Sequence, residues 1–91
     1  VLGTHTHIPT ADEQILPKGT GFISDIGMTG PFHSIIGEAI DPRIAVFVRQ
    51  EQVKPDVAEA PPYEINAILV EIDAESGKTT KIERIRQIIS D

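Results

Sequence analysis

The longest apolar run of the chain lies in its second half, at residues 67–70, where Ala, Ile, Leu and Val occupy consecutive positions. A strand that is apolar at consecutive positions is typical of one that is buried on both faces. The pattern therefore predicts a strand over residues 63–73 and places it centrally in a layered fold.

A turn with Gly77 at its end follows this strand. Four isoleucines come next at helical spacing, namely Ile82, Ile85, Ile88 and Ile89. A tight glycine turn directly after a strand nevertheless favours an antiparallel strand that returns along the first. We therefore expect a strand over residues 79–85 and a late antiparallel hairpin.

Shorter elements are expected in the first half of the chain. Residues 1–18 indicate the end of a strand followed by a loop, and residues 20–26 predict a short strand. A helix is expected to begin with Asp41 as its N-cap, followed by Pro42 in the first helical position. Three apolar residues then fall on one helical face, namely Ile44, Phe47 and Val48. The helix should end near Gln52 and before Pro55 at the latest.

Composition narrows the possible functions. The chain has 91 residues, so it forms at most one domain. Its net charge of −6 weighs against duplex nucleic acid as a partner, because an acidic surface repels phosphates. A small phosphorylated substrate remains compatible, since bound cations reverse the local field. Cysteine is absent, which excludes thiolate metal sites and fits a reducing cytosol. No apolar stretch approaches the roughly 18 residues of a membrane span.

Two histidines separated by one residue are the clearest candidates for chemistry. Val1 and Leu2 are followed by Gly3, and then by His5 and His7. Imidazoles are common metal ligands, and in an extended backbone residues i and i+2 point to the same face. The pair can therefore aim two rings at one ion or bridge two ions. The spacing alone also fits two polar loop histidines that bind nothing.

Two further sequence blocks follow the histidines. Residues 10–17 read T-A-D-E-Q-I-L-P, and residues 25–31 read D-I-G-M-T-G-P after the short strand. Together with G-T-H-T-H, these blocks resemble the C-terminal part of the YmdB-like bacterial metallophosphoesterases, which are 2′,3′-cyclic-nucleotide phosphodiesterases. The late strand, S-G-K at residues 76–78 and I-E-R-I at residues 82–85 extend the resemblance over nearly the whole chain.

The resemblance implies an α/β fold, the C-terminal part of a calcineurin-like sandwich with α/β/β/α layers. It makes residues 1–91 a C-terminal fragment of a single metallophosphoesterase domain. Family members carry Asp, Glu, Asn and further His ligands upstream of G-T-H-T-H, and those ligands are not among these residues. The expected partners are the N-terminal remainder of the same protein and a small phosphorylated substrate such as a cyclic nucleotide. A cytoplasmic location without a membrane is expected, and association into homo-oligomers is left open.

The resemblance also implies a two-metal centre. Such centres hold their ions about 3.5–4 Å apart and clamp the attacking and leaving oxygens of an in-line displacement. By similarity, His5 and His7 each bind a metal, one to each ion, and the expected cofactors are two iron or manganese ions. Both rings need to be neutral for this, so metal binding should weaken below roughly pH 6.

Four more residues are candidates for supporting the metals or lining the substrate pocket: Asp12, Asp25, Met28 and Thr29. A ligand histidine usually has its second nitrogen held by a carboxylate or a carbonyl, which makes Asp12 and Asp25 the nearby acidic candidates. Asp12 also fits a turn or a helix cap, and Asp25 the end of a strand. Met28 and Thr29 fit a glycine loop that shapes a pocket, or a plain structural turn.

The remaining polar residues receive structural interpretations. His33 follows Phe32 and has no paired ligand, so we expect it on the surface or in a packing contact. Arg84 and Arg86 are expected to form a solvated face with neighbouring acidic residues.

Three functional hypotheses follow. The first is a metal-dependent phosphodiesterase or phosphatase that takes part of its metal site from this chain, and then the isolated fragment should be inactive. The alternative is a non-catalytic structural or interaction module in which the histidine pair is incidental. The third is an enzyme reassembled from separate polypeptides. The first and third require Asn, His and carboxylate ligands from other residues, whereas the second requires none.

Overall fold

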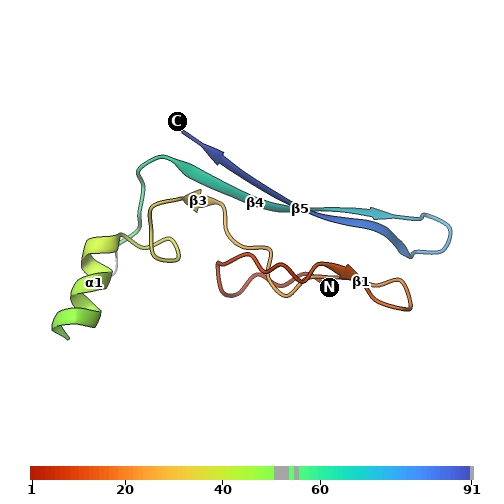
Figure 1. Ribbon diagram of the computed structural model, residues 1–91, viewed down its shortest axis with the longest axis horizontal. Coiled ribbons are helices and arrows are strands. Elements are labelled where there is room, and N and C mark those ends of the chain that lie inside the picture. The colour runs from red at the N-terminus through yellow and green to blue at the C-terminus, as the bar shows by residue number, and fades with distance from the viewer. Residues whose placement is uncertain (51–53, 55, 91) are drawn as a thin grey trace.

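The computed structural model describes residues 1–50, 54 and 56–90. The molecule is elongated, with extents of 55 × 30 × 16 Å. Its elements in chain order are β1 (Gln14–Ile15), β2 (Gly21–Phe22), β3 (Gly30–Pro31), α1 (Ile40–Arg49), β4 (Tyr63–Ile72) and β5 (Thr79–Ile89). Figure 1 shows the β4–β5 ribbon along the long axis, an N-terminal layer beside it and α1 at one end.

The late antiparallel hairpin is confirmed. Strand β4 pairs with β5 from Tyr63 opposite Ile89 to Ile72 opposite Thr79, with a register shift near the turn. The turn is closed by Asp73, whose carbonyl accepts a hydrogen bond of 2.8 Å from the backbone N–H of the turn glycine. The second strand is longer than predicted, because backbone pairing continues through the four isoleucines whose spacing is also helical.

The expected burial of β4 on both faces is wrong for this structure. The strand does lie centrally in the sheet order β3-β4-β5, but β3 pairs only with Tyr63 and Glu64. One face of the ribbon turns toward the N-terminal layer, and within the described residues no second layer covers the other. Leu69 on that other face is therefore 42% exposed.

The N-terminal layer is a short β1–β2 hairpin with a loop on each side. Strand β2 ends at Phe22, well before the predicted end at residue 26. Beyond it, Ile23 forms a single parallel bridge with Leu2. The ladder stops there because Asp25 and its neighbours bond to loops instead of to a strand.

Polar contacts join the two layers. Thr79 donates its N–H to the Gly19 carbonyl at 2.8 Å, and its hydroxyl accepts from the Gly21 N–H at 3.1 Å. The Asn66 side chain, which is nearly buried, donates to the Met28 carbonyl at 2.7 Å. Ile23 is the one fully buried apolar side chain among the described residues. The position of the N-terminal layer thus depends on hydrogen bonds more than on an apolar core.

Helix α1 differs from the prediction at both ends. It begins at Ile40 after Ala39, so Asp41 lies in the first turn, where its charge favours the helix dipole, and is not the N-cap. It ends at Arg49, and the following Gln50 adopts the left-handed conformation that commonly terminates helices. The predicted end at Gln52 and the stop at Pro55 lie outside the described residues. Over the part of the chain that is described, none of the helices has the length and apolar character needed to cross a membrane.

Gly3 provides a sharp test of this packing. A Cβ added at Gly3 would lie 1.8 Å from the Ser24 carbonyl oxygen, whereas one added at Gly77 would meet nothing within 4 Å. We expect Gly3→Ala to destabilise the protein by about 3 kcal/mol or more, because the backbone has to move to make room for the methyl group. Gly77→Ala should cost about 1–2 kcal/mol, from its positive φ of 71° alone. Equal losses in denaturant unfolding would contradict this packing.

Candidate metal-binding loop

The G-T-H-T-H segment is fixed at its base by backbone pairing with the chain after β2. The Gly3 N–H donates to the Ile23 carbonyl at 3.2 Å, and the Ile26 N–H donates to the Gly3 carbonyl at 2.9 Å. The glycine allows this close approach, because a side chain there would collide with Ser24. The loop that carries His5 and His7 therefore starts from a defined position beside Asp25.

The carboxylate of Asp25 holds the loop itself. Its Oδ2 accepts from the His5 N–H at 3.0 Å, the Thr6 N–H at 2.5 Å and the Thr6 hydroxyl at 2.7 Å. Its Oδ1 accepts from the Gly27 N–H at 2.9 Å. Asp25 is only 2% exposed. These donors, first of all the Thr6 hydroxyl, hold the pKa of Asp25 well below its usual range, so it remains an anionic acceptor.

These contacts differ from the expectation that Asp25 holds a ring nitrogen of a ligand histidine. The donors to Asp25 are backbone N–H groups and a hydroxyl, which together set the path of the loop backbone. Sequence reasoning missed this arrangement because nothing in the local pattern around Asp25 identifies donors about twenty residues away.

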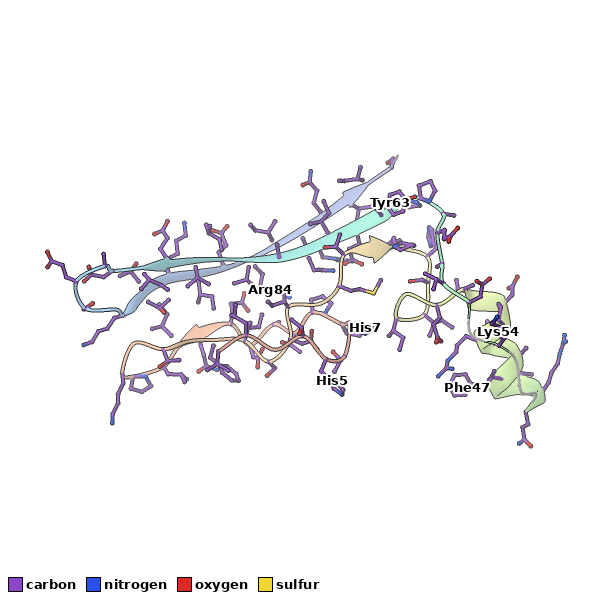
Figure 2. The ribbon with its side chains drawn as sticks, turned by 180° about the vertical axis from the view of Figure 1, so that it is seen from behind. His5, His7, Phe47, Lys54, Tyr63 and Arg84 are labelled. Carbon is purple, nitrogen blue, oxygen red and sulfur yellow. The ribbon has the colours of Figure 1, made fainter. Side chains whose placement is uncertain are left out.

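The ring of His7 is held from a different segment. Its Nδ1 lies 2.8 Å from the Ile36 carbonyl oxygen, which can only accept. In the neutral ring Nδ1 therefore carries the hydrogen, and Nε2 keeps its lone pair. Figure 2 shows His5 on the same loop, pointing away from the β4–β5 ribbon. Both histidine side chains are exposed.

The reason given for a shared face is wrong, because the loop is not extended. Residues 5–8 form a bend, and His7 has a φ of 66°, in the left-handed region. The bend is closed by the Thr6 hydroxyl, which contacts the backbone of Ile8. Residues 5 and 7 therefore do not share a face as they would in a strand, and convergence of the two rings on metal stays a prediction.

Asp12 takes a structural position beside this loop. Its carboxylate accepts from the Thr10 hydroxyl at 2.6 Å and from the Ser24 N–H at 3.1 Å, and it also bonds the Ser24 hydroxyl. These bonds, with the Ser24 hydroxyl foremost, lower the pKa of Asp12 to about 2. This fits the turn interpretation of Asp12, since its carboxylate links the two loops that carry Thr10 and Ser24.

Arg84 connects the loop region to β5, a contact that sequence reasoning did not identify. It donates to the Glu13 carboxylate at 3.2 Å and to the Thr10 carbonyl at 3.0 Å. Arg86 pairs with Glu64 at 2.5 Å. Both arginines therefore have acidic neighbours, as expected, but Arg84 faces the N-terminal layer and braces the loop that contains Asp12 instead of lying on a solvated face.

Met28 and Thr29 lie beside His7, where both line a hollow together with residues 36–38. The Met28 backbone is fixed by the bond from Asn66. His33 packs edge-on against Phe32, with ring centroids 5.0 Å apart, in agreement with a packing contact. Among the described residues, no group of three or more His, Cys, Asp or Glu side chains lies close enough to hold a metal ion.

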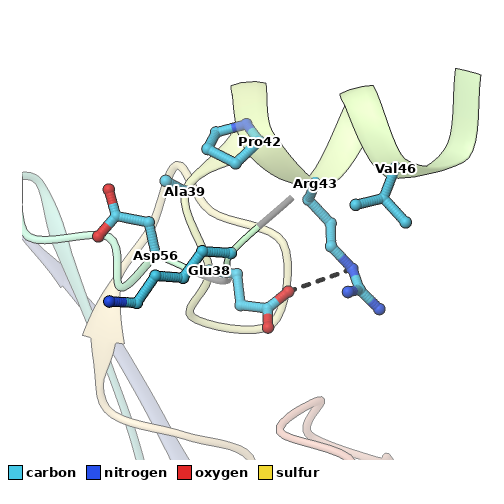
Figure 3. Close-up of a pocket in the computed structure, with 7 residues that line it drawn as sticks. Glu38, Ala39, Pro42, Arg43, Val46 and Asp56 are labelled. Atoms are coloured by element: carbon cyan, nitrogen blue, oxygen red, sulfur yellow. Dashed lines mark ion pairs between the residues drawn. The ribbon is translucent and has the colours of Figure 1, made fainter. Parts of the chain in front are cut away.

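A second hollow lies under α1. Figure 3 shows Glu38 paired with Arg43, with a distance of 3.1 Å between Oε2 and Nε. The volume of this hollow is about 10 Å³, which is room for roughly one water molecule. It is therefore too small for an organic substrate and is not the candidate site.

Comparison with known proteins identifies the family of the chain that carries this loop. Residues 1–85 match the family of YmdB-like proteins, so the chain belongs to the YmdB-like family. It is 45% identical over 85 residues to the 2′,3′-cyclic-nucleotide 2′-phosphodiesterase of Bacillus subtilis, across 93% of this chain and 32% of that protein.

Solved structures agree with this assignment. A phosphatase from Mycoplasma pneumoniae is 37% identical and superposes with a TM-score of 0.92, over 100% of this chain and 32% of that one. A hypothetical protein from Thermus thermophilus is 36% identical with a TM-score of 0.87, over 98% of this chain and 34% of that one. The chain thus spans about a third of the length of the relatives it matches.

The Asp25 contacts predict an effect on metal binding. In the complete chain, Asp25→Asn should lower metal affinity about 10–100-fold, because an amide cannot accept the same set of loop donors. Thr6→Val should have a smaller effect, since it removes one donor of three. Asp73→Asn, a turn carboxylate in the β4–β5 hairpin, is the matched control. An unchanged metal titration for Asp25→Asn would remove Asp25 from the site.

Asp12 predicts a pH dependence of stability. Its folded pKa of about 2 lies below that of an unfolded Asp, so protonation favours unfolding. Its contribution should be complete above about pH 4 and disappear as the pH falls toward about 2. The difference in unfolding free energy between wild type and Asp12→Asn should shrink over that range in denaturant titrations. Ser24→Ala should weaken this dependence, and a difference independent of pH would refute the assignment.

Proposed function

We propose that these residues form the C-terminal part of a metal-dependent phosphodiesterase in which His5 and His7 bind the ions of a two-metal centre. Family membership supports the proposal, as does the position of both histidines on one hydrogen-bonded loop. The proposal includes the calcineurin-like α/β/β/α sandwich for the complete domain and a cytoplasmic location. Its substrate class is a 2′,3′-cyclic nucleotide, following the activity named for the B. subtilis relative.

One observation carries the metal assignment. The bond between His7 Nδ1 and the Ile36 carbonyl leaves the lone pair of Nε2 available to coordinate a metal ion. Metal-ligating histidines typically donate their other ring nitrogen to a carbonyl or carboxylate in this way, which fixes both tautomer and orientation. The bond therefore gives His7 the tautomer and the fixed orientation that a metal ligand needs.

The donor set fits part of a metal centre. Imidazole nitrogen suits iron, and the proposed cofactors are two iron or manganese ions. Because the described residues hold no group of three ligands, the remaining ligands have to come from elsewhere in the protein. When bound, two ions of this kind neutralise phosphate charge and make water a better nucleophile at neutral pH.

The residues of this chain contribute position. Asp25 holds the backbone of His5 and Thr6, and the Ile36 carbonyl orients the His7 ring. A fixed ligand geometry matters because a displacement of about 1 Å in a catalytic arrangement can cost about 100-fold in rate. The loop is therefore a preorganised half-site, meaning that it supplies two ligands in fixed positions. Carboxylate and further imidazole ligands come from other parts of the protein.

The test compares two polypeptides. Residues 1–91 and the complete chain are each loaded with Mn²⁺ or Fe²⁺ and assayed on a chromogenic phosphodiester and on a 2′,3′-cyclic nucleotide. We expect turnover only from the complete chain, because the shorter one lacks enough ligands to fix two ions. In the complete chain, His5→Ala and His7→Ala should each reduce bound metal and lower kcat by at least about 100-fold.

His33→Ala is the matched control, since His33 is exposed and packs on Phe32 outside the loop. Turnover by residues 1–91 that disappears on His5→Ala would show a self-sufficient site and contradict the half-site. Full metal content and activity in both loop variants would contradict the ligand assignment and favour the structural module.

A further inference from the structure

A hollow of about 380 Å³ lies directly beside the His7 ring. Ligand pockets in proteins typically measure about 300–1,000 Å³, so this hollow is large enough for a small organic group. Its walls come from three separate segments: the loop with His7, residues 28–31, and residues 36–38 with 57 and 58. His7 and Ile36, which a hydrogen bond of 2.8 Å joins, both line it.

The lining of the hollow is mainly apolar. Met28, Pro31, Ile36, Val57 and Ala58 supply carbon and thioether surface. Among the residues that line it there is no lysine or arginine, and the one charged side chain is the carboxylate of Glu38. That carboxylate is itself paired with Arg43, so no lining residue offers a cation to a phosphate. The lining therefore fits the organic part of a phosphoester and not the phosphate itself.

Hydrogen bonds fix each wall of the hollow. The Asn66 amide holds the Met28 carbonyl at 2.7 Å, and the Ala58 N–H donates to the Gly37 carbonyl at 3.0 Å. A β-bridge joins Glu38 to Val57. A hollow whose walls are tied in this way is preformed, which lowers the entropic cost of binding a ligand.

Two glycines give the Met28 side chain its place. A Cβ on Gly30 would lie 2.9 Å from Met28 Cε, and one on Gly37 would lie 3.5 Å from Met28 Sδ. The thioether thus extends over backbone at both positions and presents a polarizable surface to the hollow. Thioether sulfur makes favourable contacts with aromatic rings, which are the apolar faces that a nucleobase offers.

We infer that this hollow receives the nucleoside part of the substrate, with Met28 and Val57 as specificity-determining contacts to the base. The inference rests on the proposed phosphodiesterase function, because it assigns the phosphate to the metal ions at His5 and His7. His7 takes part in both, because it lines the hollow and its Nε2 is the atom proposed to bind metal.

The kinetic test uses the complete metal-loaded protein and two substrates. Met28→Ala and Val57→Ala should each raise KM for 2′,3′-cyclic AMP about three- to tenfold with kcat unchanged, because both side chains line the hollow. Glycerol 1,2-cyclic phosphate has no base, so its kcat/KM should stay the same in both variants. Ile36 is left unchanged because its carbonyl holds the His7 ring. The matched control is Ile15→Ala, which removes an exposed apolar side chain from β1.

A binding test separates this inference from the proposed function. The methyl resonance of Met28, assigned by its absence in Met28→Ala, should shift on titration with adenosine, which carries no phosphate. Should the wild type hydrolyse neither substrate while adenosine still shifts this resonance, the phosphodiesterase proposal fails and the nucleoside site stands. If the Met28 resonance does not move, or if both variants lose kcat/KM equally on both substrates, the nucleoside site is wrong. Another segment of the protein would then be expected to cover the hollow.

Discussion

The histidine loop depends on one buried carboxylate. Asp25 accepts four hydrogen bonds, three of them from His5 and Thr6, and it is almost fully removed from solvent. A buried anion of this kind is tolerated only because every donor is in place, and the same donors keep it ionised. The dependence is mutual: the loop gives Asp25 its partners, and Asp25 gives the loop its bend. Apolar packing contributes little to holding the loop, because Ile23 is the one fully buried apolar side chain in the described part of the chain.

The long hairpin could be predicted because its signals are local, whereas the two-residue strands β1 and β3 lie where a loop and a turn were expected. The apolar run at residues 67–70 and the glycine turn after it predict the β4–β5 hairpin, and the structure confirms it. The histidines and the blocks around Asp12 and Asp25 likewise identify the family from short stretches of sequence. Each of these inferences uses residues that are neighbours in the chain, where periodicity and turn chemistry apply.

The contacts that shape the site could not be predicted in this way. The bond from His7 to the Ile36 carbonyl and the bond from Arg84 to the Thr10 carbonyl join residues 29 and 74 positions apart. Backbone carbonyls carry no sequence signature, so no pattern announces them as partners. The bend at His7 is equally hidden, because a positive φ is uncommon for a residue other than glycine. Burial of β4 was overestimated for a related reason. Apolar residues on both faces of a strand predict that other segments pack against both faces, but the pattern does not identify those segments.

The same contacts explain how a segment with so small a core can present a defined site. A loop usually gains its order by packing on a core, but here backbone N–H and C=O groups are tied to side chains of other segments: Asp25 to the histidine loop, Asn66 to Met28, and His7 to Ile36. The last two ties meet around the hollow beside His7, so the ring and the apolar wall have a fixed relation to each other. In the proposed arrangement, a ligand that reaches both would have its charged part bound at the histidines and its apolar part in the hollow. Specificity would then be separable from metal binding, because Met28 is not one of the proposed metal ligands.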